Sequence, residues 1–310
     1  SSSIMKLTAN ILFLLLITFG YAPKGLLASS PLPNVTPEME KPEFWIKKIE
    51  NPMNLLLTHE KIHKMNEENL KRQELRLCRI RDLKEDWSRE EILSLGFPIL
   101  SQNISEVETE GTLEDTMRLN LLIRTGHRVL YRLESFKTRT PDELYNHILR
   151  MSWEDYIPQD GYFSVTSTVN NPTIKDSRFA NVKCKDAIVD HLRDKFGKRP
   201  DTGPDRDKIV VHLYWRRDVC QVFFDTSGEP LSKRAYRMIP LKAPMQETLA
   251  AAVVMSTGWP RNGNFINPMC GSGTLAIEAT LIALNRAPGL LRSNFGFMHL
   301  KGFSESSWRV

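Results

Sequence analysis

The residues best suited to binding a small ligand lie in the stretch FINPMCGSGT, residues 265–274. Gly271 and Gly273 lack a Cβ atom, so the backbone at these positions can adopt a positive φ and approach a ligand closely. An apolar run at helical spacing, residues 275–284, follows the second glycine. The pattern predicts a strand, a tight loop and a helix whose first N–H groups face a polar ligand.

Two common phosphate-binding loops are excluded by the residues around these glycines. No lysine follows Gly273, so the loop is not a P-loop, and no third glycine completes a dinucleotide-binding pattern. Ser272 and Thr274 can cap the predicted helix through their hydroxyl groups. A Gly-Ser-Gly turn also serves as an ordinary strand-to-helix connection in α/β proteins, and these residues alone leave that interpretation open.

The form Asn-Pro-x-Cys-Gly-Ser-Gly-Thr resembles the first motif of class I S-adenosylmethionine-dependent methyltransferases, in the version typical of THUMP-domain RNA methyltransferases. The flanking stretches KAPMQETLAAA, residues 242–252, and APGL, residues 287–290, are similar to the same family. The resemblance implies S-adenosyl-L-methionine as the cofactor. It also implies cofactor contacts from the loop and from the start of the preceding helix, at Asn267, Pro268, Met269, Cys270, Gly271, Ser272, Gly273, Thr274, Gln246, Glu247 and Thr248.

A second region of interest is basic and lies upstream of the loop. The whole chain of 310 residues has a net charge of +5, and residues 171–240 alone hold 15 Lys and Arg against 10 Asp and Glu. A locally concentrated positive charge is typical of a surface that binds a polyanion. The candidate contacts lie on or beside a helix predicted to start near Asp176: Arg178, Lys183, Lys185, Arg193, Lys195, Lys198 and Arg199.

The elements that position these side chains follow from periodicity. Cys184, Ile188, Leu192 and Phe196 recur every four residues and predict the buried stripe of that helix. Alternation predicts a strand over 162–169 and a hairpin of strands 209–215 and 219–224. His212, Trp215, Phe223 and Phe224 on this hairpin are interpreted as core residues.

The stretches DSRFANVKCKDAIVD, RP and LSKRAYR, residues 176–190, 199–200 and 231–237, resemble the THUMP domain of ribosomal RNA guanine-N2 methyltransferases. That resemblance implies an α/β RNA-binding module and large-subunit ribosomal RNA as the partner. It runs from about residue 90 to the end of the sequence. A single basic residue on a helix is usually only solvated, so the set of seven supports RNA binding better than any member does.

Further elements complete the predicted fold. We expect a helix ended by Gly96, a strand over 107–111, and helices that begin after Thr112 and at Thr140-Pro141. The predicted class is α/β, with a THUMP module followed by the beginning of a doubly wound Rossmann-like methyltransferase domain. The expected division is a leader over 1–40, a charged linker or helical region over 41–89, a ferredoxin-like remnant over 90–112, the THUMP domain over 113–228 and an incomplete methyltransferase domain over 229–310.

The cysteines and the N-terminus point to different compartments. Four cysteines without paired spacing predict separate reduced thiols, no metal site and a cytoplasmic protein. The apolar run over 11–21, after Lys6 and before Ala28-Ser29-Ser30, resembles a secretory signal instead. Its exit is poor, so we expect a leader or an artefact and no stable membrane association. The oligomeric state stays open.

The expected function is that of the N-terminal part of a ribosomal RNA (guanine-N2)-methyltransferase. In the resembled family a catalytic Asn/Asp-Pro-Pro-Tyr/Phe loop follows the fourth strand, and no such motif occurs after Thr274. No catalytic residue is therefore assigned, and we expect the chain alone to be inactive. Two alternatives remain open: a THUMP protein that binds RNA without catalysis, and an exported protein if the leader is genuine.

Overall fold

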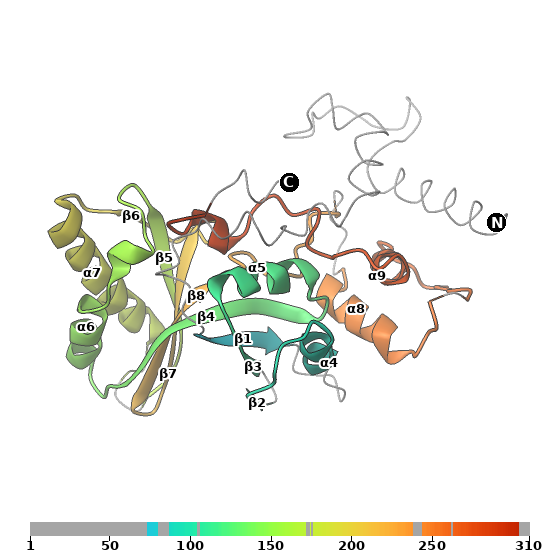
Figure 1. The fold of residues 1–310 in the computed structure, drawn as a ribbon, viewed down its shortest axis with the longest axis horizontal. Coiled ribbons are helices and arrows are strands. Elements are labelled where there is room, and N and C mark those ends of the chain that lie inside the picture. Colours follow the sequence, from blue (N-terminus) through green and yellow to red (C-terminus); the bar gives the residue numbers. More distant parts are fainter. Residues whose placement is uncertain are drawn as a thin grey trace, which may run out of the picture.

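A computed structural model describes residues 73–79, 87–103, 106–171, 174, 176–237, 244–261 and 263–303. These residues form one eight-stranded sheet with helices packed against it (Figure 1). Helices α6 and α7 lie at one end of the molecule, and α8 and α9 lie at the opposite end. No helix in this described part of the chain is long and apolar enough to cross a membrane. The predicted leader over 1–40 lies outside the described residues.

The strands are ordered β2-β3-β1-β4-β8-β7-β5-β6 across the sheet. Pairing is antiparallel from β2 to β7, and β5 is parallel to both β7 and β6. The strands are β1 (Gln73–Arg79), β2 (Ser101–Gln102), β3 (Glu106–Gly111), β4 (Gly126–Lys137), β5 (Tyr162–Asn170), β6 (Asp201–Thr202), β7 (Ile209–Arg216) and β8 (Val219–Asp225).

The long strand β4 joins two parts of the sheet. It pairs with β1 from Gly126 to Tyr131 and with β8 from Leu130 to Lys137. The helices are α4 (Trp87–Ser94), α5 (Leu113–Leu122), α6 (Pro141–Leu149), α7 (Ser177–Phe196), α8 (Glu247–Ser256) and α9 (Thr274–Ala283), with short 3₁₀ helices η3 (Trp153–Asp155) and η4 (Gly296–His299). β4 runs without interruption from one part of the sheet into the other. The domain boundary expected at residue 112 stays a prediction.

Strand β1 was not expected. The sequence predicted a charged linker or helical region over 41–89, whereas residues 73–79 form a strand between β3 and β4. The register pairs Leu77 with Val107 on one side and Val129 on the other. The prediction was wrong here because a strand of seven residues depends on its neighbours in the sheet, and these lie about 30 and 50 positions further along the chain.

The helix starts and ends agree with the sequence. Thr112 and Asp115 form a reciprocal capping box at α5, and the Thr140 hydroxyl accepts a hydrogen bond from the Glu143 N–H ahead of Pro141. Asp176 caps α7, which ends at Gly197. Local side-chain chemistry decides these boundaries, which is why they could be predicted.

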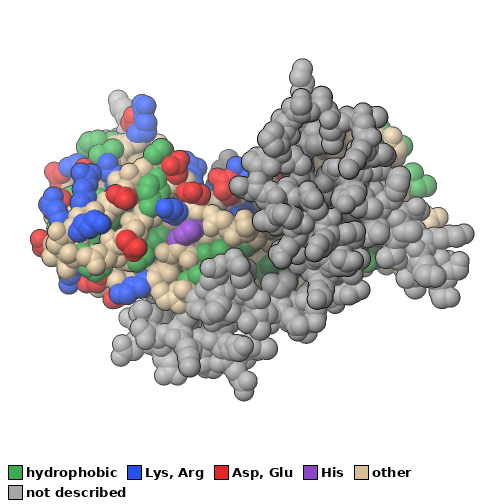
Figure 2. Space-filling model, turned by 90° about the horizontal axis from the view of Figure 1, so that it is seen from above, with side chains coloured by type: hydrophobic (Ala, Val, Ile, Leu, Met, Phe, Trp, Pro, Cys, Tyr) green, Lys and Arg blue, Asp and Glu red, His purple; other side chains and the backbone are tan. Residues whose placement is uncertain are grey.

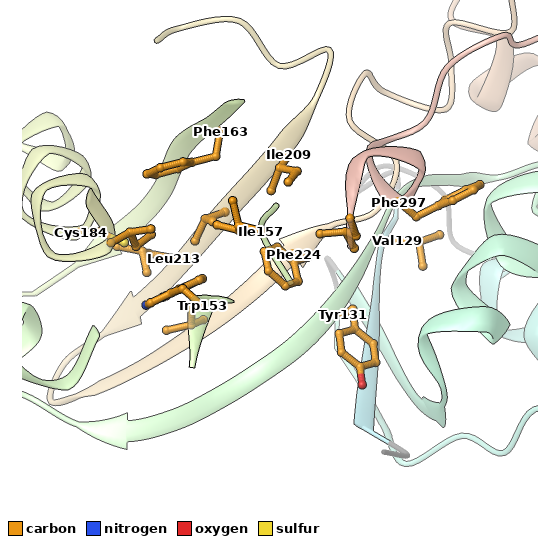
Figure 3. Packing of buried hydrophobic residues seen from close by; sticks show 14 of the residues in the cluster. Val129, Tyr131, Trp153, Ile157, Phe163, Cys184, Ile209, Leu213, Phe224 and Phe297 are labelled. Carbon is orange, nitrogen blue, oxygen red and sulfur yellow. The ribbon is translucent and has the colours of Figure 1, made fainter. Parts of the chain in front are cut away.

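The core lies between the sheet and the helices (Figure 3). Trp215, Phe223 and Phe224 are buried, which confirms their interpretation as core residues. His212 is half-buried in β7, where its Nδ1 lies 2.9 Å from the Thr166 hydroxyl. Cys184 and Cys220 are buried free thiols and Cys270 is an exposed one. Figure 3 shows Cys184 of α7 and Leu213 of β7 packed in the same layer as Phe163 of β5.

The segment after α9 returns to the sheet and packs on it. Arg292 donates hydrogen bonds to the carbonyl groups of Pro230, Ser227 and Glu229 at 2.7, 3.0 and 3.1 Å. Gly296 lies so close to β8 that a Cβ atom there would be 2.4 Å from the Asp225 carbonyl oxygen. Phe295 and Phe297 are buried in the core beside it. The returning segment therefore fixes the end of the described chain to β8 and to residues 227–230, which follow β8.

Candidate functional site

The loop at residues 267–273 has the backbone conformation that its sequence predicted. Gly271 and Gly273 have φ values of +53° and +79°, in the left-handed region that favours glycine. The loop is exposed, and Met269 is 89% accessible. A Cβ atom on Gly271 would meet nothing within 4 Å, and one on Gly273 would meet only Ile277 at 3.9 Å. The glycines are therefore explained by backbone conformation and not by crowding within the described part of the chain.

Two local expectations for the loop were wrong. Residues 265–266 form no strand, and Ile266 is 83% exposed. A strand requires a hydrogen-bonding neighbour. All strands of the described sheet come from residues 73–225, and none of them pairs with residues 265–266. Gly273 is the N-cap of α9 and no side chain caps this helix, because the Ser272 hydroxyl bonds the Thr274 hydroxyl at 3.0 Å instead.

The start of α8 supplies the other predicted cofactor residues. Gln246 is the exposed N-cap of α8, while Glu247 and Thr248 are buried. The Thr248 Oγ1 and Asn267 Nδ2 atoms are buried without a hydrogen-bond partner among the described residues. Buried polar atoms are nearly always paired in folded proteins, so both atoms fit a role in ligand binding.

Arg237 connects the starts of the two helices. Its Nη2 donates to the Met245 carbonyl group and the Thr274 hydroxyl at 3.0 Å each, and it lies 3.2 Å from a carboxylate oxygen of Glu247. Burial raises the pKa of Glu247, and the charge of Arg237 opposes that shift. The structure thus brings together Glu247 and Thr274, which are 27 positions apart in the sequence. Arg237 was not among the predicted site residues, although it lies in the LSKRAYR stretch.

A buried ion pair anchors α9 one turn further along. Arg234 and Glu278 are 2% and 0% exposed, and the Arg234 Nε donates to Glu278 Oε1 at 2.8 Å. The Tyr236 hydroxyl donates to the same oxygen at 2.9 Å. Arg234 also donates to the carbonyl groups of Leu231 and Arg124. The residues 234–237 therefore hold the first five residues of α9 and connect them to the loop after α5.

Ala235 lies within this segment in a strained conformation, with a φ of +66°. Its side chain is exposed, so substitution removes little packing. A left-handed conformation costs an L-residue about 1–2 kcal/mol, and the greater freedom of glycine in the unfolded chain offsets part of this. We expect Ala235→Gly to raise the free energy of unfolding by about 0.5–1 kcal/mol, measured by urea denaturation. A lower stability for this variant would contradict the strain.

The predicted RNA-binding residues all lie on α7 or just after it, and most are paired with acids. Figure 2 shows Lys and Arg side chains interspersed with Asp and Glu over the described part of one face. The ion pairs are Arg178 with Asp176, Lys183 with Asp142, Lys185 with Asp186, Arg193 with Asp190 and Lys195 with Glu154. Lys198 and Arg199 are exposed after Gly197. Exposed pairs of this kind are weak, so phosphate groups can compete for these cations.

The helix separates the seven residues into two groups. Twenty residues of α-helix extend about 30 Å. Arg178, Lys183 and Lys185 therefore lie toward one end of α7, and Arg193, Lys195, Lys198 and Arg199 lie at or beyond the other. The structure does not bring all seven into one compact patch, so an RNA that contacts them all must follow the helix.

Glu154 of η3 pairs with residues near the C-terminal end of α7 and makes the free energy of unfolding depend on pH. Partial burial alone would raise the pKa of Glu154. Hydrogen bonds from His191 at 2.6 Å and from Lys195 together outweigh burial and lower this pKa from 4.5 to about 2. The stabilisation is fully present above pH 4.5 and is lost as the pH falls toward 2. We expect Glu154→Gln to cost about 1–2 kcal/mol at pH 7 and less than half of that at pH 3, measured by urea denaturation. An equal cost at both pH values would contradict this ionisation.

Comparisons with known proteins match three successive segments of the chain. Residues 85–130 match an RlmL ferredoxin-like domain, residues 138–225 a THUMP domain and residues 234–308 an RMKL-like methyltransferase domain. The last match begins at Arg234 and includes the whole glycine loop. The chain thus contains a THUMP domain followed by an RMKL-like methyltransferase domain.

The sequence is also similar to curated proteins named ribosomal RNA large subunit methyltransferase K/L. The protein from Syntrophotalea carbinolica is 38% identical over 212 residues, which cover 67% of this chain and 30% of the relative. The protein from Allochromatium vinosum is 37% identical over 224 residues, covering 71% and 30%. The chain thus spans about 30% of the length of these relatives.

Solved structures resemble the chain over a larger share of their length. A predicted N6-adenine-specific DNA methylase from Listeria monocytogenes superposes with a TM-score of 0.68 and 32% identity, covering 77% of this chain and 62% of that one. The structure of SMU.472, complexed with SAH, gives a TM-score of 0.67 and 29% identity over the same shares. The likeness confirms the predicted α/β class with a THUMP domain and a methyltransferase-like fold.

Proposed function

We propose that this chain is the N-terminal part of a ribosomal RNA (guanine-N2)-methyltransferase, with one part that binds RNA and one that binds S-adenosylmethionine. The observation that supports this best is the exposed glycine loop at the start of α9. Residues 234–237 connect this helix start to Arg124, and the segment after α9 bonds residues 227–230, which follow β8. The names of the K/L relatives support large-subunit ribosomal RNA as the substrate.

The residues at the loop fit the proposed cofactor. When bound, S-adenosylmethionine supplies a methyl group on a sulfonium centre. Asn267 to Thr274 would line its methionine portion, with Gln246, Glu247 and Thr248 on the other side. The buried, unpartnered Thr248 Oγ1 and Asn267 Nδ2 offer hydrogen bonds to polar ligand atoms. Left-handed glycines let the loop backbone approach the ligand without a side chain between them.

The THUMP half, residues 138–225, would bind the RNA through basic residues on α7 or just after it, namely Arg178, Lys183, Lys185, Arg193, Lys195, Lys198 and Arg199. Because α7 and α9 lie at opposite ends of the molecule, an RNA bound to both must extend along the sheet (Figure 1). Such an arrangement suits a large folded RNA, in which the docking element and the target nucleotide are separate.

The proposed contribution of these residues is binding and orientation. Transfer to an exocyclic amine requires acceptors for its N–H groups close to the sulfonium methyl. We assign no residue of this chain as an acceptor for those N–H groups. We propose that the chain binds both ligands but transfers no methyl group unaided. Action on ribosomal RNA implies a cytoplasmic location, and no step in this account requires a metal ion.

The experiment that tests the RNA part is filter binding of large-subunit ribosomal RNA at several salt concentrations. With several phosphate contacts, the affinity should fall at least tenfold between about 50 and 200 mM salt. The triple variant Lys195→Ser, Lys198→Ser, Arg199→Ser should bind more weakly and with a smaller salt slope. RNA binding that no α7 variant weakens would contradict the assignment. RNA binding without affinity for S-adenosylmethionine would favour the alternative of an RNA-binding protein without catalysis.

A further inference from the structure

Arg237 has more hydrogen-bonding capacity than its protein partners use. All three recorded contacts, with Met245, Glu247 and Thr274, are made by Nη2. A guanidinium group has five N–H donors on three nitrogen atoms. Within the described part of the chain, Nη1 and Nε have no recorded partner. The side chain is 21% exposed, so these donors lie at the edge of the site.

The position of this charge is electrostatically costly without an anion. Arg237 contacts the first residues of both α8 and α9, where the helix dipoles present partial positive charge. Glu247 supplies one carboxylate, but it is buried and burial raises its pKa. A second carboxylate at this position would interact favourably with the guanidinium group and with both helix starts.

Two unpartnered groups among the predicted cofactor residues favour the same kind of ligand. Thr248 follows Glu247 at the start of α8, and its hydroxyl is buried without a partner among the described residues. Asn267 begins the glycine loop, and its amide nitrogen is a buried donor in the same state. Hydroxyl, amide and guanidinium donors together form a set that matches a carboxylate, whose oxygen atoms only accept hydrogen bonds.

We propose that Arg237 binds the amino-acid carboxylate of the cofactor. This inference rests on the proposed function, since it names the contact for one end of S-adenosylmethionine. Arg237 remains bonded to Thr274 through Nη2, while Nη1 and Nε donate to the carboxylate oxygen atoms. The residue thereby orients the methionine portion across the glycine loop.

The test compares two ligands that differ in this group. S-adenosylhomocysteine carries the amino-acid chain with its carboxylate and ammonium groups, whereas 5′-methylthioadenosine keeps the adenosine and sulfur but has a methyl group in place of that chain. We expect Arg237→Gln to lower the affinity for S-adenosylhomocysteine about 10- to 100-fold and to change that for 5′-methylthioadenosine less than twofold, measured by calorimetry. The control Arg261→Gln removes an exposed charge from the same part of the chain and should change neither affinity.

The outcomes separate this contact from other roles. An equal loss of affinity for both ligands in Arg237→Gln would overturn the proposal, because it indicates a residue that only positions the helices. Unchanged affinity for both ligands would also overturn it. Arg237→Lys keeps the charge but not the planar fork, so it should retain part of the difference in affinity between the two ligands. It also replaces Arg237→Gln in the test if circular dichroism shows that the Gln variant is unfolded. If the unmodified chain binds neither ligand, the cofactor site of the proposed function itself fails.

Discussion

Gly273→Val is expected to lower the affinity for S-adenosylhomocysteine by at least 100-fold. Valine is β-branched and cannot readily adopt the φ of +79° found at this position. The loop would have to rearrange, which moves the backbone N–H groups at the start of α9 away from the ligand. The new side chain would also stand on the exposed surface that faces the cofactor. Calorimetric titration of the ligand into the variant measures the loss.

Gly197→Val is the matched control for this change. Gly197 has a φ of +68° at the end of α7, and a Cβ atom there would meet nothing within 4 Å. Both substitutions therefore introduce similar backbone strain in open space, and both should destabilise the fold by a similar amount. Only the variant in the loop should lose ligand. Unchanged affinity in Gly273→Val would remove the loop from the cofactor site.

Arg234→Met is expected to destabilise the protein by about 3–5 kcal/mol, because it leaves the Glu278 carboxylate buried without its counter-charge. Among the described residues, only the Tyr236 hydroxyl would remain as a recorded partner of that group. Methionine fills a similar volume, so the effect reports the lost charge more than a cavity. Urea denaturation at pH 7, followed by circular dichroism, measures the change.

Lys233→Met is the control for the ion pair. Lys233 pairs with Glu229 four residues earlier, but both side chains are exposed. Exposed pairs contribute about 0–1 kcal/mol, so this variant should stay within that range of the unmodified protein. A similar cost for both variants would show that burial does not set the value of the Arg234 pair.

Local chemistry made much of the fold predictable from the sequence. Thr112, Thr140 and Asp176 cap helices through contacts within three residues. Of the stripe that the four-residue spacing predicted, α7 buries Cys184, Ile188 and Leu192, and Phe196 is half-buried. The left-handed glycines of the loop follow equally from residue type. In each case the interaction that decides the local structure joins residues close together in the sequence.

Features that depend on distant partners could not be predicted. β1 is a strand because β3 and β4 lie on either side of it, and residues 265–266 are not a strand because no described neighbour pairs with them. The role of Arg237 also required the structure, since Glu247 and Thr274 meet only after α8 and α9 have packed together. Sequence indicated which residues could bind a cofactor, and tertiary structure showed what holds them.

The most direct test of the central claim is the change in backbone amide NMR signals when S-adenosylhomocysteine is added to the full chain. Our account predicts saturable shifts at residues 267 and 269–274 and at the start of α8, with little change along α7. The absence of any saturable shift, or shifts confined to the THUMP half, would contradict the assignment of a cofactor site to the glycine loop.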